Sequence, residues 1–351
     1  MTDLLAGIGG LLGANQIPQR QIGVSIKLAQ NTQTNQPTTF AGLGSSGGGI
    51  GALGSGGLSG LISASAGGSQ LNILGLRVSA RVRNAGVLPT CTVKIWGLPP
   101  SILNQLNSLG MRLNIITGNK LTVSAGNSST ALSPVFYGDI LYGSADYDNQ
   151  PDVPLTIEAS AGTPVLASTP TSFPQGFSVS EAMSNLAGKM GLSFNNAGNI
   201  NIQLPPIYLS GSPLVQIRKL AQAAGISFGI SPTQALEIFQ KGTPRKDGSV
   251  IVISKQTGMI ASPTFSGPCI VVKTLFNPNI KQSSPIQIQS TVLSAVANLP
   301  LGQSLSYSPI STQYTVQQID LELEAQVPKG QWMMTLQGYP AGTNPVLPSA
   351  T

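Results

Sequence analysis

The fold of this chain is decided by residues 258–292, GMIASPTFSGPCIVVKTLFNPNIKQSSPIQIQSTV. Apolar and polar side chains alternate along 270–276 and again along 285–292, which is the pattern of strands with one buried face. An Asn-Pro-Asn segment at 277–279 separates the two runs, and proline cannot donate a hydrogen bond to a strand ladder. The stretch therefore predicts two strands joined by a tight connection.

The composition extends this strand pattern to most of the chain. Only 9% of the 351 residues are charged, whereas glycine (41) and proline (26) are abundant, which favours short strands joined by turns. The sequence therefore predicts a β-dominated α+β protein. Further strands are expected at 21–28, 76–83, 91–96, 112–117, 120–125, 133–144, 153–159, 234–240, 249–254, 314–327 and 331–339.

Helical periodicity occurs mainly in the middle of the chain. Ser178 and Glu181 have capping-box spacing at the start of a helix expected over 178–190. Ser212 and Pro213 begin a second helix, which Gly225 ends. A third, short helix is expected after the paired prolines at 99–100. The middle of the chain therefore predicts a small α+β domain.

Two stretches resemble a known family. The Gly-Met-x-x-x-Pro-Thr-Phe run at 258–265 and the Leu-Phe-Asn-Pro-x-Ile run at 275–280 resemble the second barrel of baseplate hub proteins of contractile-tailed bacteriophages. Residues 93–109, VKIWGLPPSILNQLNSL, resemble the strand and short helix of the first hub barrel. The resemblance covers roughly residues 75 to 340, and the family is shared with contractile injection systems.

The resemblance implies two tube-forming, β-barrel-like domains that flank the small α+β domain. The expected layout has an apolar N-terminal segment (1–20) and a C-terminal tail (341–351). The domains between them are a first barrel (21–162) with a glycine-rich insertion (41–70), an α+β domain (163–254) and a second barrel (255–340).

The function that the resemblance implies is structural. A hub of this family forms a homotrimeric ring that adapts the six-fold tail tube to the three-fold spike and surrounds the DNA channel. The partners expected are other copies of the chain, the tail tube protein, the spike protein and the baseplate wedge proteins, with the tape-measure protein as a further candidate. DNA passes through without sequence-specific contact, and the location is the virion tail baseplate, assembled in the host cytoplasm.

Several chemistries are disfavoured by the residues that the chain lacks. It has no histidine and two cysteines, and no phosphate-binding or dinucleotide-binding motif follows a strand. We therefore predict no catalytic, cofactor-binding or metal-binding residue. The alternative that stays open is a tail-associated enzyme that degrades cell wall, which would use the carboxylates between Asp139 and Asp152 together with Glu158. The hub of a bacterial contractile injection particle is a further alternative.

Charge patterning identifies a candidate interface. Basic residues recur on one side of the strand at 76–83, and acidic residues recur on one side of the strand at 314–327. Opposite charges across an interface favour specific association, so these stripes are candidates for a contact between subunits. The residues concerned are Arg77, Arg81, Arg83, Asp320, Glu322 and Glu324.

The remaining charges and the termini give no targeting signal. The net charge of +6 comes from scattered Lys and Arg residues, so nucleic-acid recognition is not the favoured interpretation. The N-terminus has no basic segment of a signal peptide. Residues 28–76 carry no charge, but frequent glycine and polar residues argue against a membrane span.

Overall fold

The structure is a computed structural model that describes residues 19–29, 62–64, 69–84, 88–107, 118–127, 130–161, 169–173, 176–266, 269–290 and 313–340. The strand predicted at 112–117 and the two terminal segments lie outside these residues, except for Gln19 and Arg20. Of the glycine-rich insertion, only residues 62–64 and 69–70 are described. No helix in the described part of the chain is long and apolar enough to cross a bilayer.

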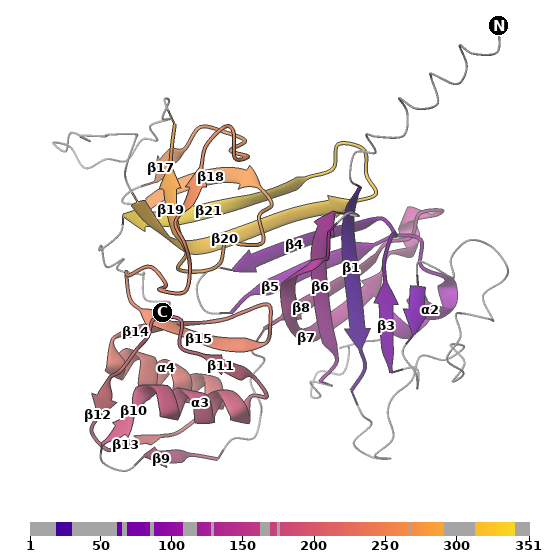
Figure 1. Ribbon diagram of the computed structural model, residues 1–351. Coiled ribbons are helices and arrows are strands. Elements are labelled where there is room, and N and C mark those ends of the chain that lie inside the picture. The colour runs from indigo at the N-terminus through magenta and orange to yellow at the C-terminus, as the bar shows by residue number, and fades with distance from the viewer. Residues whose placement is uncertain are drawn as a thin grey trace, which may run out of the picture.

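One large antiparallel sheet dominates the fold (Figure 1). Its strands run in the order β17-β18-β21-β20-β4-β5-β8-β7-β6-β1-β3-β2, with β19 and β16 branching from β20. The first β region contributes β1 (Arg20–Lys27), β2 (Ile62–Ala64), β3 (Gln70–Ile73), β4 (Val78–Asn84), β5 (Thr90–Ile95), β6 (Lys120–Asn127), β7 (Ser133–Ala145) and β8 (Leu155–Ser160). The second β region contributes β16 (Ile251–Ile253), β17 (Thr264–Ser266), β18 (Cys269–Leu275), β19 (Pro285–Ile288), β20 (Gln313–Ala325) and β21 (Trp332–Pro340).

Alternating side chains give this sheet one apolar face. Along β1, β6 and β7, for example, Val24, Val123 and Phe136 lie in register and are buried. The α2 helix (Pro100–Leu106) packs on β7 through three buried side chains, Ile102, Leu103 and Leu106. The β-dominated α+β class predicted from the sequence is therefore confirmed.

The prediction that a tight connection joins the two strands of 258–292 is wrong, because β18 ends at Leu275 and β19 begins at Pro285. The strand β18 pairs with β17 and β21, whereas β19 pairs with β20 and, in parallel, with β16. The loop between β18 and β19 therefore carries the chain from the main path of the sheet to its branch. Alternation along each strand was visible in the sequence, but it does not specify which strand becomes the neighbour.

The two β regions share one sheet and do not form two closed barrels in the described residues. They are joined by β4 and β20, which pair from Val78↔Ala325 to Asn84↔Ile319. The first region nevertheless curls towards the second, so that β1 lies beside β20. Arg20 of β1 donates a 2.7 Å hydrogen bond to the Gly330 carbonyl in the β20–β21 turn, and its guanidinium lies 5.7 Å from the ring centroid of Trp332. Side-chain contacts thus join β1 to the β20–β21 turn, where backbone pairing of strands would be needed to close a barrel.

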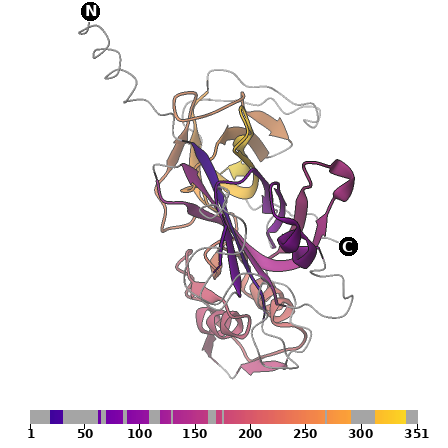
Figure 2. The same ribbon diagram turned by 90° about the vertical axis from the view of Figure 1, so that its right-hand side faces the viewer.

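Helices and short strands form the α+β region between residues 171 and 240. Its elements are β9 (Thr171–Phe173), β10 (Phe177–Ser178), α3 (Val179–Lys189), β11 (Ser193–Asn195), β12 (Gln203–Leu204), β13 (Ile207–Leu209), α4 (Pro213–Ala224), β14 (Ile226–Ile230) and β15 (Ala235–Gln240). The helices pack between the β11-β15-β14 sheet and two ribbons, β10–β12 and β9–β13. Figures 1 and 2 both show this region below the second β region.

The two predicted helices form, but their N-termini differ. The Ser212 side chain accepts a hydrogen bond from the Val215 N–H, and Gly225 ends α4 in the left-handed conformation (φ 64°) that glycine tolerates. The side chain of Ser178, by contrast, makes no cap hydrogen bond. Instead the first N–H of α3, from Val179, donates to the Ile202 carbonyl, because β10 pairs with β12 immediately before the helix.

A buried arginine joins the α+β region to the second β region. All five N–H donors of Arg245 are used: by the Asp247 carboxylate, by the Glu237 carboxylate of β15 at 3.3 and 3.4 Å, and by the Gln282 carbonyl at 3.3 Å. The Arg245 side chain is 3% exposed. At the same junction Gly229 packs so closely on Gln282 that a Cβ would lie 2.2 Å from its Oε1.

Candidate functional site: the exposed face of the sheet

The exposed face of the sheet is polar across both β regions. Each strand turns one set of side chains inward, and strand pairing aligns the other set into rows that cross the sheet. One row runs from β18 to β6. It consists of Lys273, Thr335, Asp320, Arg83, Thr90, Ser160, Asp139 and Lys120.

Three of the cations on this face lie opposite carboxylates. Arg81 and Glu322 are cross-strand neighbours, and their side chains form an ion pair with Nη2 3.0 Å from Oε1. Lys120 pairs in the same way with Asp139. Six cations and five carboxylates occupy the face in the described residues. They are Lys27, Arg81, Arg83, Lys94, Lys120 and Lys273, with Asp139, Glu158, Asp320, Glu322 and Glu324.

The five predicted interface residues that belong to β4 and β20 lie on this side of their junction, and Arg77 directly precedes β4. Arg83 is the register partner of Asp320, and Arg81 is the partner of Glu322. Glu324 accepts a 3.0 Å hydrogen bond from the Gln331 N–H. The Arg77 guanidinium lies 4.3 Å from the ring centroid of Trp96. The two stripes therefore meet within one chain, and their contact with neighbouring subunits stays a prediction.

Sequence reasoning missed several members of the face. Lys94, Lys120 and Lys273 each alternate with buried apolar residues, and this signal could have identified them.

The pKa of Tyr142 is raised above its ordinary value, chiefly by a side-chain hydrogen bond with Glu158 and also by burial and the charge of Glu158. The face is thus a network of polar contacts whose charges nearly cancel.

Three of the carboxylates of the enzyme alternative have polar partners in the described residues. The Asp146 carboxylate accepts hydrogen bonds from the Asp148 N–H and the Asn149 amide, so it stabilises the turn after β7. Asp139 contacts Lys120, and Glu158 contacts Tyr142. A glycosidase needs two carboxylates across one cleft. No cluster of three or more potential metal-ligating His, Cys, Asp or Glu side chains occurs among the described residues.

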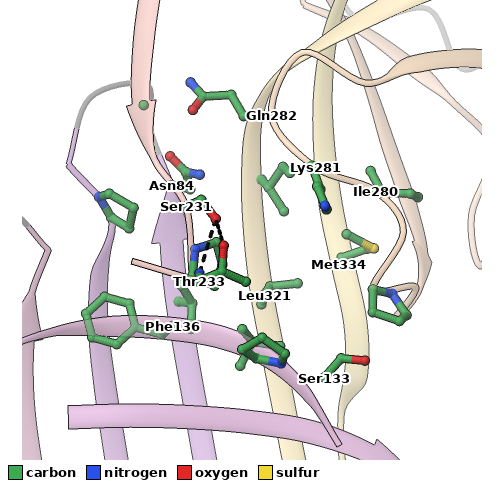
Figure 3. Close-up of a pocket in the computed structure, with 18 of the residues that line it drawn as sticks. Asn84, Ser133, Phe136, Ser231, Thr233, Ile280, Lys281, Gln282, Leu321 and Met334 are labelled. Atoms are coloured by element: carbon green, nitrogen blue, oxygen red, sulfur yellow. Dashed lines mark hydrogen bonds between the residues drawn. The ribbon is translucent and has the colours of Figure 1, made fainter. Parts of the chain in front are cut away.

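A cavity of about 310 Å³ lies where the sheet forks (Figure 3). There β20 pairs with β19 at residues 313–315 and with β4 at residues 319–325. Leu321 and Met334 form part of the wall, and Ser231 and Thr233, whose hydroxyls are 2.6 Å apart, contribute a polar edge. One carboxylate, Glu237, lines this cavity, and Arg245 already binds it. The cavity therefore offers no pair of carboxylates among the described residues.

A solved complex shows the same fold at low sequence identity. The Francisella PdpA–VgrG complex in its half-lidded form matches with a TM-score of 0.52 and 8% identity over 100% of this chain and 63% of that chain. The 43 kDa tail protein of prophage MuSo2 from Shewanella oneidensis gives 0.49 and 7% identity over 79% and 96% of the two chains.

A third structure is the E. coli c3393 protein, described as a type VI secretion component similar to the T4 tail proteins gp27 and gp5. It gives a TM-score of 0.46 and 8% identity over 75% and 73% of the two chains. No curated protein sequence matches this chain.

The family is established by sequence. The family described as baseplate hub gp41 matches residues 66–308, which is more than half of the chain. This range includes the two stretches that resemble hub barrels and the β4–β5 part of the polar face. The resemblance predicted from those stretches is therefore confirmed. The chain belongs to the baseplate hub gp41 family and is a structural hub protein of a phage tail.

Proposed function

We propose that the chain forms a homotrimeric ring that joins the six-fold tail tube to the three-fold spike, with DNA passing through its centre. The observation that carries the proposal is the continuous sheet: two β regions lie side by side through β4 and β20 and share one polar face. Three copies would supply six such regions around an axis, which matches a six-fold tube above and a three-fold spike below.

In this arrangement the polar face lines the channel. A channel for DNA must stay hydrated, and polar side chains cover the face across both regions. Three of the six cations of the face lie beside carboxylates, as in Arg81–Glu322 and Lys120–Asp139, and the five carboxylates offset most of the positive charge. Because strong DNA binding needs uncompensated cations that replace counterions, this face suits passage without retention. The open ends of the sheet, at β2 and β17, are where neighbouring copies would meet.

The division into tube domains at 21–162 and 255–340 stays part of the proposal, as do the tube, spike, wedge and tape-measure partners. The role is structural and not enzymatic, in keeping with the family and with the arrangement of the carboxylates. A hub of a bacterial contractile injection particle is the second candidate, which the fold shared with the Francisella complex favours.

Native mass spectrometry of the purified chain tests the ring. The protomer has a mass of 36.1 kDa, so three copies give about 108 kDa. A dominant trimer supports the proposal, and tail tube and spike proteins then become the binding partners to test. A stable hexamer would instead indicate a ring of the tail tube. Turnover of purified cell wall, lost on changing Asp148→Ala, would contradict the structural role.

A further inference from the structure

The α+β region carries an uncompensated positive charge on its surface. Between residues 182 and 236 the sequence contains Lys189, Arg218 and Lys219 and no aspartate or glutamate. All three cations are exposed. Glu181 precedes Lys189 by eight positions on α3, which places it about 12 Å away along the helix axis. No salt bridge involves these cations in the described residues.

Hydrogen bonds fix two of these cations beside the β9–β13 ribbon. The Lys189 ammonium donates to the Thr171 hydroxyl of β9. The Lys219 ammonium donates to the carbonyl and the hydroxyl of Ser210, directly after β13, at 3.2 and 3.3 Å. Because Thr171 pairs with Leu209 in the ribbon, both lysines are attached to the same short stretch of structure. Arg218 is the neighbour of Lys219 on the exposed side of α4.

An exposed aromatic residue belongs to the same ribbon that the two lysines contact. Tyr208, in the middle of β13, is 67% exposed, the largest exposed fraction among the exposed large hydrophobic residues described. Val215 of α4 is 38% exposed and packs against Gly211, just beyond the ribbon. We name Lys189, Tyr208, Val215, Arg218 and Lys219 the ribbon patch. In Figure 1 the β9–β13 ribbon lies at the end of the α+β region farthest from the large sheet.

We propose that the ribbon patch is a docking site for an acidic segment of a neighbouring tail protein. An aromatic centre with a charged rim is the arrangement in which tyrosine contributes most to binding, and the rim steers a partner of opposite charge. Because the patch carries three positive charges, we expect the partner segment to be acidic. Because the partner is a tail component, the inference rests on the proposed function.

A protein segment fits this patch better than the other anionic partners. A single-stranded nucleic acid is held by successive aromatic residues along a basic groove, and Tyr208 is the one aromatic residue in the patch. A membrane surface is bound by clusters of more cations with several inserted apolar side chains. The ribbon patch, with one tyrosine, one valine and three cations, has the size of a small interface. Its partner would need only a few carboxylates.

The test measures binding of a fluorescein-labelled acidic peptide, built from the repeat Glu-Asp-Leu-Phe, to the full-length chain by fluorescence anisotropy at low salt. The variant Lys189→Gln/Arg218→Gln/Lys219→Gln should bind about tenfold more weakly or worse, and Tyr208→Ser should also weaken binding. The matched control, Lys94→Gln/Arg81→Gln/Lys273→Gln, removes three exposed cations from the sheet face and should leave the affinity unchanged.

Equal binding by the wild type and the ribbon-patch variant, or no binding by either, overturns the proposal. Tighter binding of an oligothymidylate of equal length, or of phosphatidylglycerol vesicles, at the ribbon patch also overturns it and identifies the other partner class. Circular dichroism shows whether each variant is folded. If the chain binds the peptide at this patch but stays monomeric in native mass spectrometry, the ring fails and the docking site stands.

Discussion

The exposed face of the sheet and the ribbon patch use charge in opposite ways. On the sheet, Arg81, Arg83 and Lys120 lie in register with carboxylates, and the five carboxylates of the face offset most of its positive charge. On the ribbon patch, Lys189 and Lys219 bind the ribbon that carries the exposed Tyr208, and no salt bridge in the described residues involves Lys189, Arg218 or Lys219. A net charge of +6 therefore indicates little about function until the residues around each cation are known.

We expect the largest effect from a change at Arg245, which joins the α+β region to the second β region. The change Arg245→Met leaves the Glu237 carboxylate buried without its cation, and breaking a buried pair costs about 3 to 5 kcal/mol. Urea unfolding should show this loss of stability. The control Arg218→Met, on the exposed side of α4, should change the free energy of unfolding by less than about 0.5 kcal/mol. A loss below about 1 kcal/mol at Arg245 would show that the junction does not depend on this residue.

Acid should weaken the same junction by a smaller amount. Arg245 lowers the pKa of Asp247 below its ordinary value of 3.8, mainly through their hydrogen bond. Since the folded pKa is the lower one, this contribution is complete above about pH 4 and is lost as the pH falls through the folded pKa. The stability difference between wild type and Asp247→Asn should therefore narrow in acid. A difference that stays constant down to about pH 2 contradicts this assignment, and Asp152→Asn, in an exposed turn, is the matched control.

A double-mutant cycle measures how strongly opposite charges attract each other on the exposed face of the sheet. The side chains of Arg81 and Glu322 are 56% and 33% exposed, so their ion pair should contribute about 0.2 to 1 kcal/mol. The coupling energy comes from Arg81→Ala, Glu322→Ala and the double variant in urea unfolding, and it should shrink in high salt. A coupling energy of zero at low salt would mean that register alone, without attraction, places these residues together.

The smallest effect on stability is expected at the ribbon patch. Removing three cations that have no carboxylate partners eliminates repulsion and no ion pair. The triple glutamine variant should therefore match the wild type in melting temperature or slightly exceed it. Removing Arg81, Lys94 and Lys273 from the sheet should lower the melting temperature, because Glu322 loses its partner. Equal losses in the two variants would remove the distinction between the surfaces.

Local sequence patterns predicted where the strands lie in the chain better than which strands pair with one another. Alternation located β1, β5, β7 and β20 to within a few residues, because each strand buries one face. The junction of β4 with β20 could not be predicted in this way, because the paired residues lie far apart in the chain. The same holds for the hydrogen bond between Arg20 and Gly330.

The candidate site was visible in part. The arginine stripe at 77–83 and the acidic stripe at 320–324 were read from alternation, but their meeting within one chain follows from sheet order, which no local pattern encodes. The ribbon patch was missed because its cations come from two helices and its tyrosine from a three-residue strand. The one signal available was the absence of acidic residues between 182 and 236.

A cryo-electron microscopy reconstruction of the purified, assembled chain would show whether the polar face borders a channel. We expect a three-fold ring in which the face carrying Arg81, Glu322 and Lys120 borders the central channel and the ribbon patch lies away from it. A ring whose channel is bordered by the ribbon patch, or an assembly that buries the polar face against another subunit, would rule out the proposed arrangement.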